Sequence, residues 1–166
     1  EMLYAPWREN YTTNTAQGPK GQENADQETC IFCCLQKEEN DAESFILKRY
    51  EHCFVILNRY PYNPGHLLII PYEHKKIITE ITQNARIEIM DVLNKTTELL
   101  YKELDCHGIN IGLNMGKAAG AGIPSHLHWH VLPRWIGDTN FLPTLAGTKT
   151  VSTDLPTLYK KLINCL

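Results

Sequence analysis

The sequence predicts an α+β domain in which an antiparallel sheet of about five strands packs against one long helix and a C-terminal helix. Several apolar runs have the length of a strand and are separated by turn residues. Only one long segment has helical spacing, so the strands are joined largely by hairpins, which favours an antiparallel sheet. The 166 residues fit one core. We therefore expect residues 1–166 to form a single domain.

Each strand is expected where a short apolar run is bounded by turn residues. Residues 53–57 form a continuous apolar run, as a buried strand shows. The turn-rich segment 59–65 then leads into a second apolar run at 66–70, which Pro71 ends, so these two strands form a hairpin with a long turn. The remaining strands are expected at 45–49, 109–114 and 126–135.

The long helix is expected at 84–104, where apolar residues recur three or four positions apart, among them Ile87, Met90 and Leu93. Gly108 follows as a plausible stop. A C-terminal helix is expected at 154–164, with Asp154 as its cap and a proline in its first turn. A short helical turn is also expected at 78–81.

The N-terminal part of the chain divides into an aromatic segment and a polar one. Residues 1–11 carry three aromatic side chains, so we expect them to pack on the domain or on a neighbouring subunit. Residues 12–29 are almost without apolar side chains and predict a mobile loop. The first residues lack the basic start and apolar stretch of a secretory signal, and no apolar run approaches the ~20 residues that span a bilayer.

The composition argues against several classes of partner. A net charge of −3 disfavours binding to nucleic acid through bulk positive charge, although a small phosphate ligand needs only a few local donors. Six cysteines are too few for a disulfide scaffold at this length. We expect a reduced, cytoplasmic protein that binds neither nucleic acid nor a membrane.

Three histidines in strict alternation, His126, His128 and His130, mark the candidate site. A strand directs alternate side chains to opposite faces, so the imidazoles form a row spaced about 6–7 Å apart, while the apolar residues between them pack inward. Such a row suits a metal site, because neutral imidazole is a common zinc ligand. It also suits nucleotidyl transfer, in which one histidine attacks phosphorus and its neighbours donate hydrogen bonds.

The loop before this strand favours the phosphate chemistry. Residues 114–122 are mostly small, so their backbone N–H groups can approach an anion closely. Such a loop alone is more often a plain turn, but its position beside the histidine row points to a phosphate ligand.

At these residues the sequence resembles the histidine-triad (HIT) family, whose signature is His-x-His-x-His followed by apolar residues. The resemblance extends to Asn58, to Asn114 and to the run 63–71, Asn-Pro-Gly-His-Leu-Leu-Ile-Ile-Pro. Segments 3–8, 120–130 and 133–141 resemble one branch in particular, the bacterial diadenosine tetraphosphate phosphorylases. The resemblance implies a HIT-like fold.

The resemblance also implies a role for each histidine. The middle histidine of the family attacks the α-phosphate and forms a covalent nucleotidyl-histidine, which assigns His128, and a backbone carbonyl near the triad holds its other nitrogen. His130 would hydrogen-bond the α-phosphate oxygens. His126 would orient the site or serve the leaving group. No cofactor is required for this chemistry.

The acceptor of the second step separates a hydrolase from a phosphorylase. Many HIT hydrolases carry Gln four residues before the first histidine, where this chain has Gly122. A glycine leaves room for a phosphate ion, so the resemblance implies phosphorolysis of diadenosine tetraphosphate to ADP and ATP. The candidate phosphate contacts are Gly120, Gly122, Ser125, Lys117, Arg134 and Lys149.

Nucleotide contacts are expected on the hairpin and near residue 30. Asn58 lies where the family places an acidic or amide side chain on the ribose hydroxyls. Residues resembling the apolar base pocket are Ile31, Phe32, Phe54 and Leu57, and Asn114 completes the set. For Phe54 and Leu57 a plain core role is about equally expected.

The pair Cys30 and Cys33 has zinc-knuckle spacing but supplies only two ligands. Some HIT proteins complete a structural zinc site with histidines at the positions of His74 and His126. Two interpretations stay open, a structural zinc and a pair of buried free thiols.

Three alternatives to a phosphorylase also stay open. One is a HIT hydrolase of dinucleoside polyphosphates or adenosine phosphoramidates. Another is a nucleotide sensor without turnover, which the intact triad argues against. The third is a metalloenzyme that uses all three histidines and would lose activity with a chelator. Because HIT proteins commonly pair and the aromatic N-terminal segment needs a surface to cover, we expect a homodimer or a higher homo-oligomer.

Overall fold

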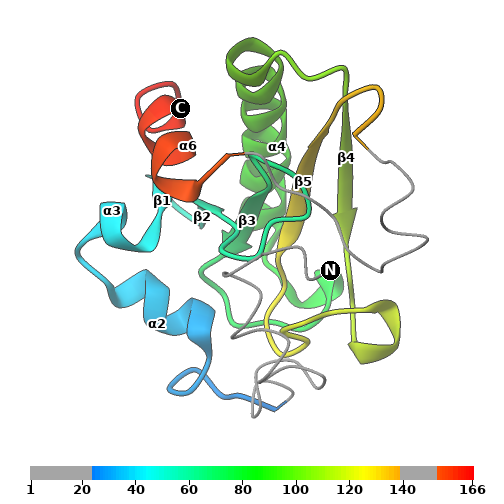
Figure 1. Ribbon diagram of the computed structural model, residues 1–166. Coiled ribbons are helices and arrows are strands. Elements are labelled where there is room, and N and C mark those ends of the chain that lie inside the picture. Colours follow the sequence, from blue (N-terminus) through cyan, green and yellow to red (C-terminus); the bar gives the residue numbers. More distant parts are fainter. Residues whose placement is uncertain (1–23, 139–152) are drawn as a thin grey trace, which may run out of the picture.

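The computed structural model describes residues 24–138 and 153–166 and shows a five-stranded antiparallel sheet flanked by helices (Figure 1). The strands are β1 (Ile46–Arg49), β2 (Cys53–Leu57), β3 (Leu67–Pro71), β4 (Gly108–Leu113) and β5 (Trp129–Arg134). They pair in the order β1-β2-β3-β5-β4, and every neighbouring pair is antiparallel. The predicted α+β class is confirmed, and so is the predicted sheet.

The long helix α4 (Gln83–Leu104) begins one residue before the expected range and ends at the residue expected. The Thr82 side chain caps its start by accepting the N–H of Ala85. The helix ends at Asp105, which adopts the left-handed conformation at a φ of 49°. The prediction that Gly108 stops the helix is therefore wrong, since Gly108 begins β4.

Two smaller helical elements agree with the sequence pattern. Helix α6 (Leu155–Leu162) starts after Asp154, whose carboxylate accepts the N–H of Thr157, and it carries a proline in its first turn. The short 3₁₀ helix η1 (Ile78–Glu80) lies where a helical turn was expected.

Two short helices, α2 (Ile31–Lys37) and α3 (Asp41–Ser44), were not predicted from the sequence. Arg49 on β1 holds both of them, because its guanidinium donates to the backbone carbonyls of residues 35, 36 and 38 and to the Asp41 carboxylate. For α2 this cap comes from a residue more than ten positions away, so the local pattern does not reveal it.

The segment expected to be a mobile loop lies partly within the described residues. Residues 24–29 form a turn in which the Asp26 carboxylate accepts the N–H groups of Glu28 and Thr29. Residues 12–23, the aromatic segment 1–11 and Lys149 lie outside the described residues.

The sheet separates two apolar clusters. Val55, Leu57 and Val131 pack with α4 and α6 on one face. Phe54 and Ile56, which alternate with them along β2, pack with α2 on the other. All residues of β2 and β3 are consequently buried, which explains their unbroken apolar runs.

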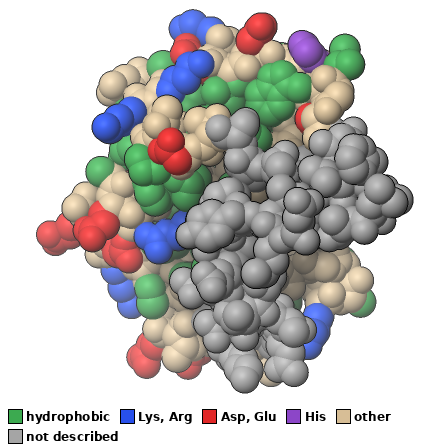
Figure 2. Space-filling view, viewed as in Figure 1, with side chains coloured by type: hydrophobic (Ala, Val, Ile, Leu, Met, Phe, Trp, Pro, Cys, Tyr) green, Lys and Arg blue, Asp and Glu red, His purple; other side chains and the backbone are tan. Residues whose placement is uncertain are grey.

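Helix α4 buries a stripe of residues that only partly matches the predicted one. Ile89, Val92 and Leu93 are buried, whereas Ile87 and Met90 are 55% and 59% exposed. Within the described residues, no helix is long and apolar enough to cross a bilayer. Both basic and acidic side chains lie on the described part of the face shown in Figure 2.

Candidate active site

The three histidines lie on the side of the sheet that α2 covers. His130 belongs to β5, and His126 and His128 precede it in an irregular stretch, so the strand starts three residues later than predicted. The reason is that the N–H of Leu127 donates to the carbonyl of Lys75, in the segment after β3, and not to a sheet neighbour. The alternation survives, because Leu127 is buried in the core beneath the start of α4.

The contacts of His128 leave one of its ring nitrogens with an unused lone pair. Its Nδ1 lies 3.0 Å from the backbone carbonyl of His126, and a carbonyl can only accept, so Nδ1 carries the proton and Nε2 keeps its lone pair. The side chain is buried against the Phe32 ring, with ring centroids 5.1 Å apart. Burial lowers the pKa of His128, which keeps the imidazole neutral at physiological pH.

His126 has both of its nitrogens engaged. Nε2 lies 2.9 Å from the carbonyl of Pro71, which places the proton there. Nδ1 lies 3.4 Å from the sulfur of Cys30 and 3.5 Å from that of Cys33. Because the side chain is also buried, it has no nitrogen left for a leaving group, and its carbonyl serves to orient His128.

His66, at the start of β3, is a fourth site histidine that the sequence analysis did not identify as functional. It is fully buried, and its Nε2 lies 2.9 Å from Nδ1 of His130. The backbone N–H of Tyr62 and the amide of Asn58 both lie 3.2 Å from Nδ1 of His66. The alternation of side chains along β3 could have revealed this residue, because His66 lies on the face of the strand that points toward α2.

These contacts fix the tautomers of two histidines. A backbone N–H only donates, so Nδ1 of His66 is the acceptor and Nε2–H donates to Nδ1 of His130. His130 is therefore left with its N–H on Nε2, as a hydrogen-bond donor. Burial lowers the pKa of His66 to about 3 and that of His130 to about 4, so both rings are neutral near pH 7.

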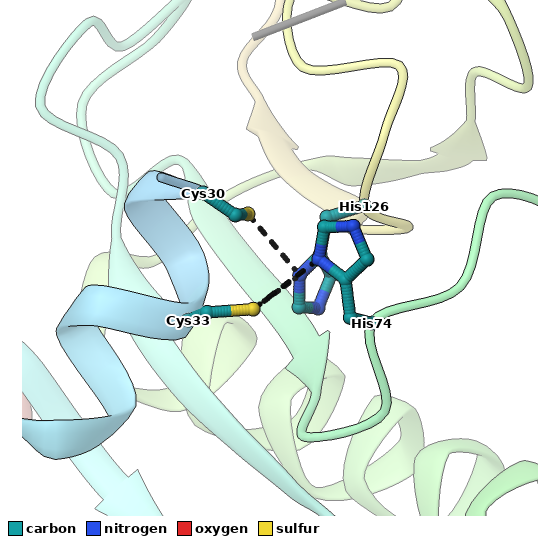
Figure 3. A group of neighbouring side chains, drawn as sticks. All are labelled: Cys30, Cys33, His74 and His126. Carbon is teal, nitrogen blue, oxygen red and sulfur yellow. Dashed lines mark hydrogen bonds between the residues drawn. The ribbon is translucent and has the colours of Figure 1, made fainter. Parts of the chain in front are cut away.

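Cys30, Cys33, His74 and His126 form a compact group between α2 and the histidine row (Figure 3). One ligand atom from each residue lies within 4.8 Å of all the others, and Cys33 and His74 approach to 3.2 Å. A tetrahedral zinc ion with bonds of about 2.0–2.3 Å separates its ligand atoms by about 3.5 Å, so this donor set fits zinc. The carbonyl of Pro71 orients His126 as an outer partner of a zinc-bound histidine would.

Of the predicted nucleotide contacts, some lie beside the histidines and others do not. Phe32 contacts His126 and His128, and Ile31 beside it is 45% exposed. Phe54 is fully buried beneath α2. Leu57 packs beneath α4, on the other face of the sheet from the histidines, so it forms core and not site.

The two predicted asparagines are both held in place. The carbonyl oxygen of Asn58 accepts the N–H of Tyr60, which turns its amide nitrogen toward His66. Asn114 is half-buried beside Gly120, since a Cβ at Gly120 would lie 3.9 Å from the amide nitrogen of Asn114.

The small-residue loop contains a 3₁₀ turn, η2 (Lys117–Ala119), which was not predicted. Gly120 needs to be glycine, because its φ of 88° lies in the left-handed region. Lys117 and Gly122 are exposed at this loop. Ser125 is fully buried, and its hydroxyl has no hydrogen-bond partner among the residues that the structure describes.

Arg134 lies in a network at the far end of β5. Its guanidinium donates to Asp138 at 2.6 and 2.8 Å and to Asn110 at 2.8 Å. Asn63, buried in the hairpin turn, donates to the same carboxylate. Arg134 therefore ties β5 to the hairpin turn.

Comparison with known proteins gives this geometry a context. The HIT domain family matches residues 39–135. The AP-4-A phosphorylase of Mycobacterium tuberculosis is 34% identical over 152 residues, which cover 91% of this chain and 76% of that protein. The adenylylsulfatase HINT3 of Arabidopsis thaliana is 32% identical over 110 residues, covering 65% of this chain and 53% of that protein.

Solved structures share the fold. A zinc-bound histidine triad family protein from Mycobacterium smegmatis superimposes with a TM-score of 0.68 at 24% identity, covering 84% of this chain and 94% of that one.

Proposed function

Because the chain belongs to the HIT family, we propose that it transfers a nucleotidyl group from a dinucleoside polyphosphate through a covalent bond to His128, with phosphate as the final acceptor. One observation carries this proposal. The buried His128 has Nδ1 held by a carbonyl, which leaves Nε2 as the only nitrogen that can attack. The 34% identity to an AP-4-A phosphorylase supports diadenosine tetraphosphate as the substrate.

The reaction divides into two displacements at one phosphorus. In the first, Nε2 of His128 bonds to the α-phosphorus, the bond to the bridging oxygen breaks, and ATP leaves. In the second, an oxygen of inorganic phosphate bonds to the same phosphorus, the P–N bond breaks, and ADP leaves. The carbonyl of His126 stabilises the positive charge on the His128 imidazole while the nucleotidyl group is attached to it.

His130 is the triad member placed to donate. Its tautomer leaves the N–H on Nε2, as set by His66, whereas both nitrogens of His126 are used elsewhere. We assign to His130 the hydrogen bond that stabilises the developing charge on phosphate oxygens in both steps. His126 then orients His128 and takes no part at the leaving group.

A hydrolase is the second candidate, and one observation favours it. Two residues proposed to hold phosphate are engaged or buried, since Arg134 binds Asp138 and Ser125 is inaccessible. Water as the acceptor would give AMP and ATP. The proteins similar to this chain also include the adenylylsulfatase HINT3.

The products separate the two candidates. Diadenosine tetraphosphate is incubated with wild-type protein with and without inorganic phosphate, and the nucleotides are resolved by chromatography. Phosphorolysis gives ADP and ATP only when phosphate is present. Gly122→Gln should crowd out phosphate and shift the products toward AMP. AMP and ATP from the wild type in saturating phosphate would contradict the phosphorylase and support the hydrolase.

We also propose that Cys30, Cys33, His74 and His126 bind a structural zinc ion. The compact donor set and the orientation of His126 by Pro71 support this. The metal would hold α2 against the histidine row and supply no reacting group. Elemental analysis of freshly purified protein should find about one zinc per chain, and metal-free folded protein would leave the cysteines as free thiols.

A further inference from the structure

Tyr62 presents an aromatic ring at the outer end of the histidine row. Its ring lies nearly parallel to that of His130, at an interplanar angle of 18° and a centroid distance of 6.1 Å, and packs on His66 at 4.9 Å. The side chain is 46% exposed, although it stands next to the buried imidazole of His66 and the half-buried one of His130. The mechanism derived above uses only its backbone N–H.

The turn that carries Tyr62 is held rigidly. The backbone N–H of Tyr62 donates to His66, and the next residue, Asn63, is buried and donates to the carbonyl of Pro133 and to Asp138. Arg134 and the backbone N–H of Trp135 fix the same carboxylate. A half-exposed aromatic ring on a turn this firmly held loses little conformational entropy when a ligand packs on it.

The position of the ring indicates which part of the substrate it meets. Phe32 and His126 lie at the opposite end of the histidine row, where the apolar base pocket of the transferred nucleotide is expected. His130, the donor to the phosphate oxygens, lies between that end and Tyr62. A polyphosphate that extends past His130 therefore brings its second nucleoside toward Tyr62.

We propose that Tyr62 is the stacking platform for the base of the leaving nucleotide. This inference rests on the proposed function, because it requires a substrate with two nucleosides. Every nucleobase has a π-face, so the platform selects for the presence of a second base with little regard to its identity. It would give the enzyme a preference for dinucleoside polyphosphates over mononucleotides with the same phosphate chain.

The test compares two substrates that differ only in the second nucleoside. The specificity constants kcat/KM are measured for diadenosine tetraphosphate and adenosine 5′-tetraphosphate. Tyr62→Ala should lower kcat/KM for the dinucleotide by on the order of 10-fold, mainly through KM, and change that for the mononucleotide less than twofold. Tyr62→Phe should match the wild type with both substrates, because stacking needs the ring and not the hydroxyl.

Two further variants separate stacking from structure. Tyr62→Leu keeps an apolar cover over His66 but has no π-face, so it should show the same selective loss as Tyr62→Ala. Tyr101→Ala removes a tyrosine of equal exposure, 47%, from α4 and should change neither substrate. Equal losses for both substrates would assign Tyr62 a structural role and overturn the proposal. Wild-type protein that cleaves no dinucleotide would overturn the proposed function, and this inference with it.

Discussion

The second nitrogen of each imidazole decides what that histidine can do. His128 has its Nδ1 bound to a carbonyl, which suits it to the proposed role of nucleophile, whereas His130 has its Nδ1 bound to His66 and keeps its N–H on Nε2 for the proposed role of donor. His126 has neither nitrogen available. Three residues with the same side chain thus take three roles because their neighbours differ.

His128→Ala should abolish turnover while nucleotide binding remains measurable by calorimetry. The variant removes the only nitrogen placed to attack, but it leaves the expected base and ribose contacts in place. His130→Ala should retain more activity, falling by about 10²–10⁴-fold, as expected when a charge-stabilising donor is lost. Near-normal turnover in His128→Ala would exclude this residue as the nucleophile.

The buried imidazoles should make the protein less stable in mild acid. The pKa is lowered to about 3 in His66 and about 4 in His130, whereas an unfolded histidine titrates near 6.5. The unfolded chain therefore binds more protons between these values, and the free energy of unfolding falls as the pH drops from about 6.5 toward 4. At pH 5 each of these two imidazoles lowers the free energy of unfolding by about 2 kcal/mol relative to its value at pH 7.5.

Urea unfolding at pH 7.5, 6 and 5 measures this dependence. His130→Asn removes one of the imidazoles whose pKa is lowered by burial and should reduce the slope between pH 6.5 and 5. An unfolding free energy that is equally pH-dependent in the wild type and the variant would show that His130 does not titrate as stated.

The histidine row could be predicted from the sequence because strand alternation is a local property. The contact from His66 that supports this row could not be predicted in the same way. His66 meets His130 only because β3 pairs with β5, and the two residues are 64 positions apart in the chain. For Leu57 the sequence left a core role and a site role open for a related reason, since a strand buried on both faces does not reveal which face a given side chain occupies.

At the scale of elements, α2 links the cysteine pair to the histidine row. The helix carries Phe32 between the two cysteines, and the ring of Phe32 lies against His126 and His128. Apart from these contacts, α2 is held at its C-terminal end by Arg49. The sequence analysis found the cysteines but not the helix, because its end is fixed by a residue on β1.

Removal of zinc should loosen α2 more than any other helix. A chelator takes away the proposed tie between the start of α2 and the histidine row, whereas α6 packs through Leu158 and Leu162 on the other face of the sheet. Hydrogen exchange at residues 31–37 should therefore accelerate at least tenfold after chelation, while exchange in α6 stays constant. Unchanged exchange in α2 would mean that packing and the Arg49 cap alone hold the helix.

At the scale of the whole molecule, one edge of the sheet and one part of α4 remain as candidates for subunit contact. Strand β4 pairs only with β5 among the described strands and carries no charged residue, which leaves its outer backbone groups able to pair with another chain. Ile111 lies opposite the buried Val131, on the α4 face of the sheet, and is 50% exposed. The N-terminal half of α4, which packs near Leu113 at the end of β4, exposes Ile87 and Met90.

We predict that these surfaces form the interface of a homodimer with twofold symmetry. Ile111→Lys should dissociate the dimer, because a charge would be buried where an apolar side chain is expected. A twofold interface loses each contact twice, so two isoleucines worth about 1.5–3 kcal/mol each correspond to a factor of about 10²–10⁴ in Kd. Sedimentation velocity at micromolar concentration measures the effect.

Ile136→Lys is the matched control, since Ile136 is 88% exposed in the turn after β5 and its substitution should leave the dimer intact. A wild-type protein that sediments as a monomer, or an Ile111→Lys variant that remains a dimer, would place the subunit contact elsewhere or remove it.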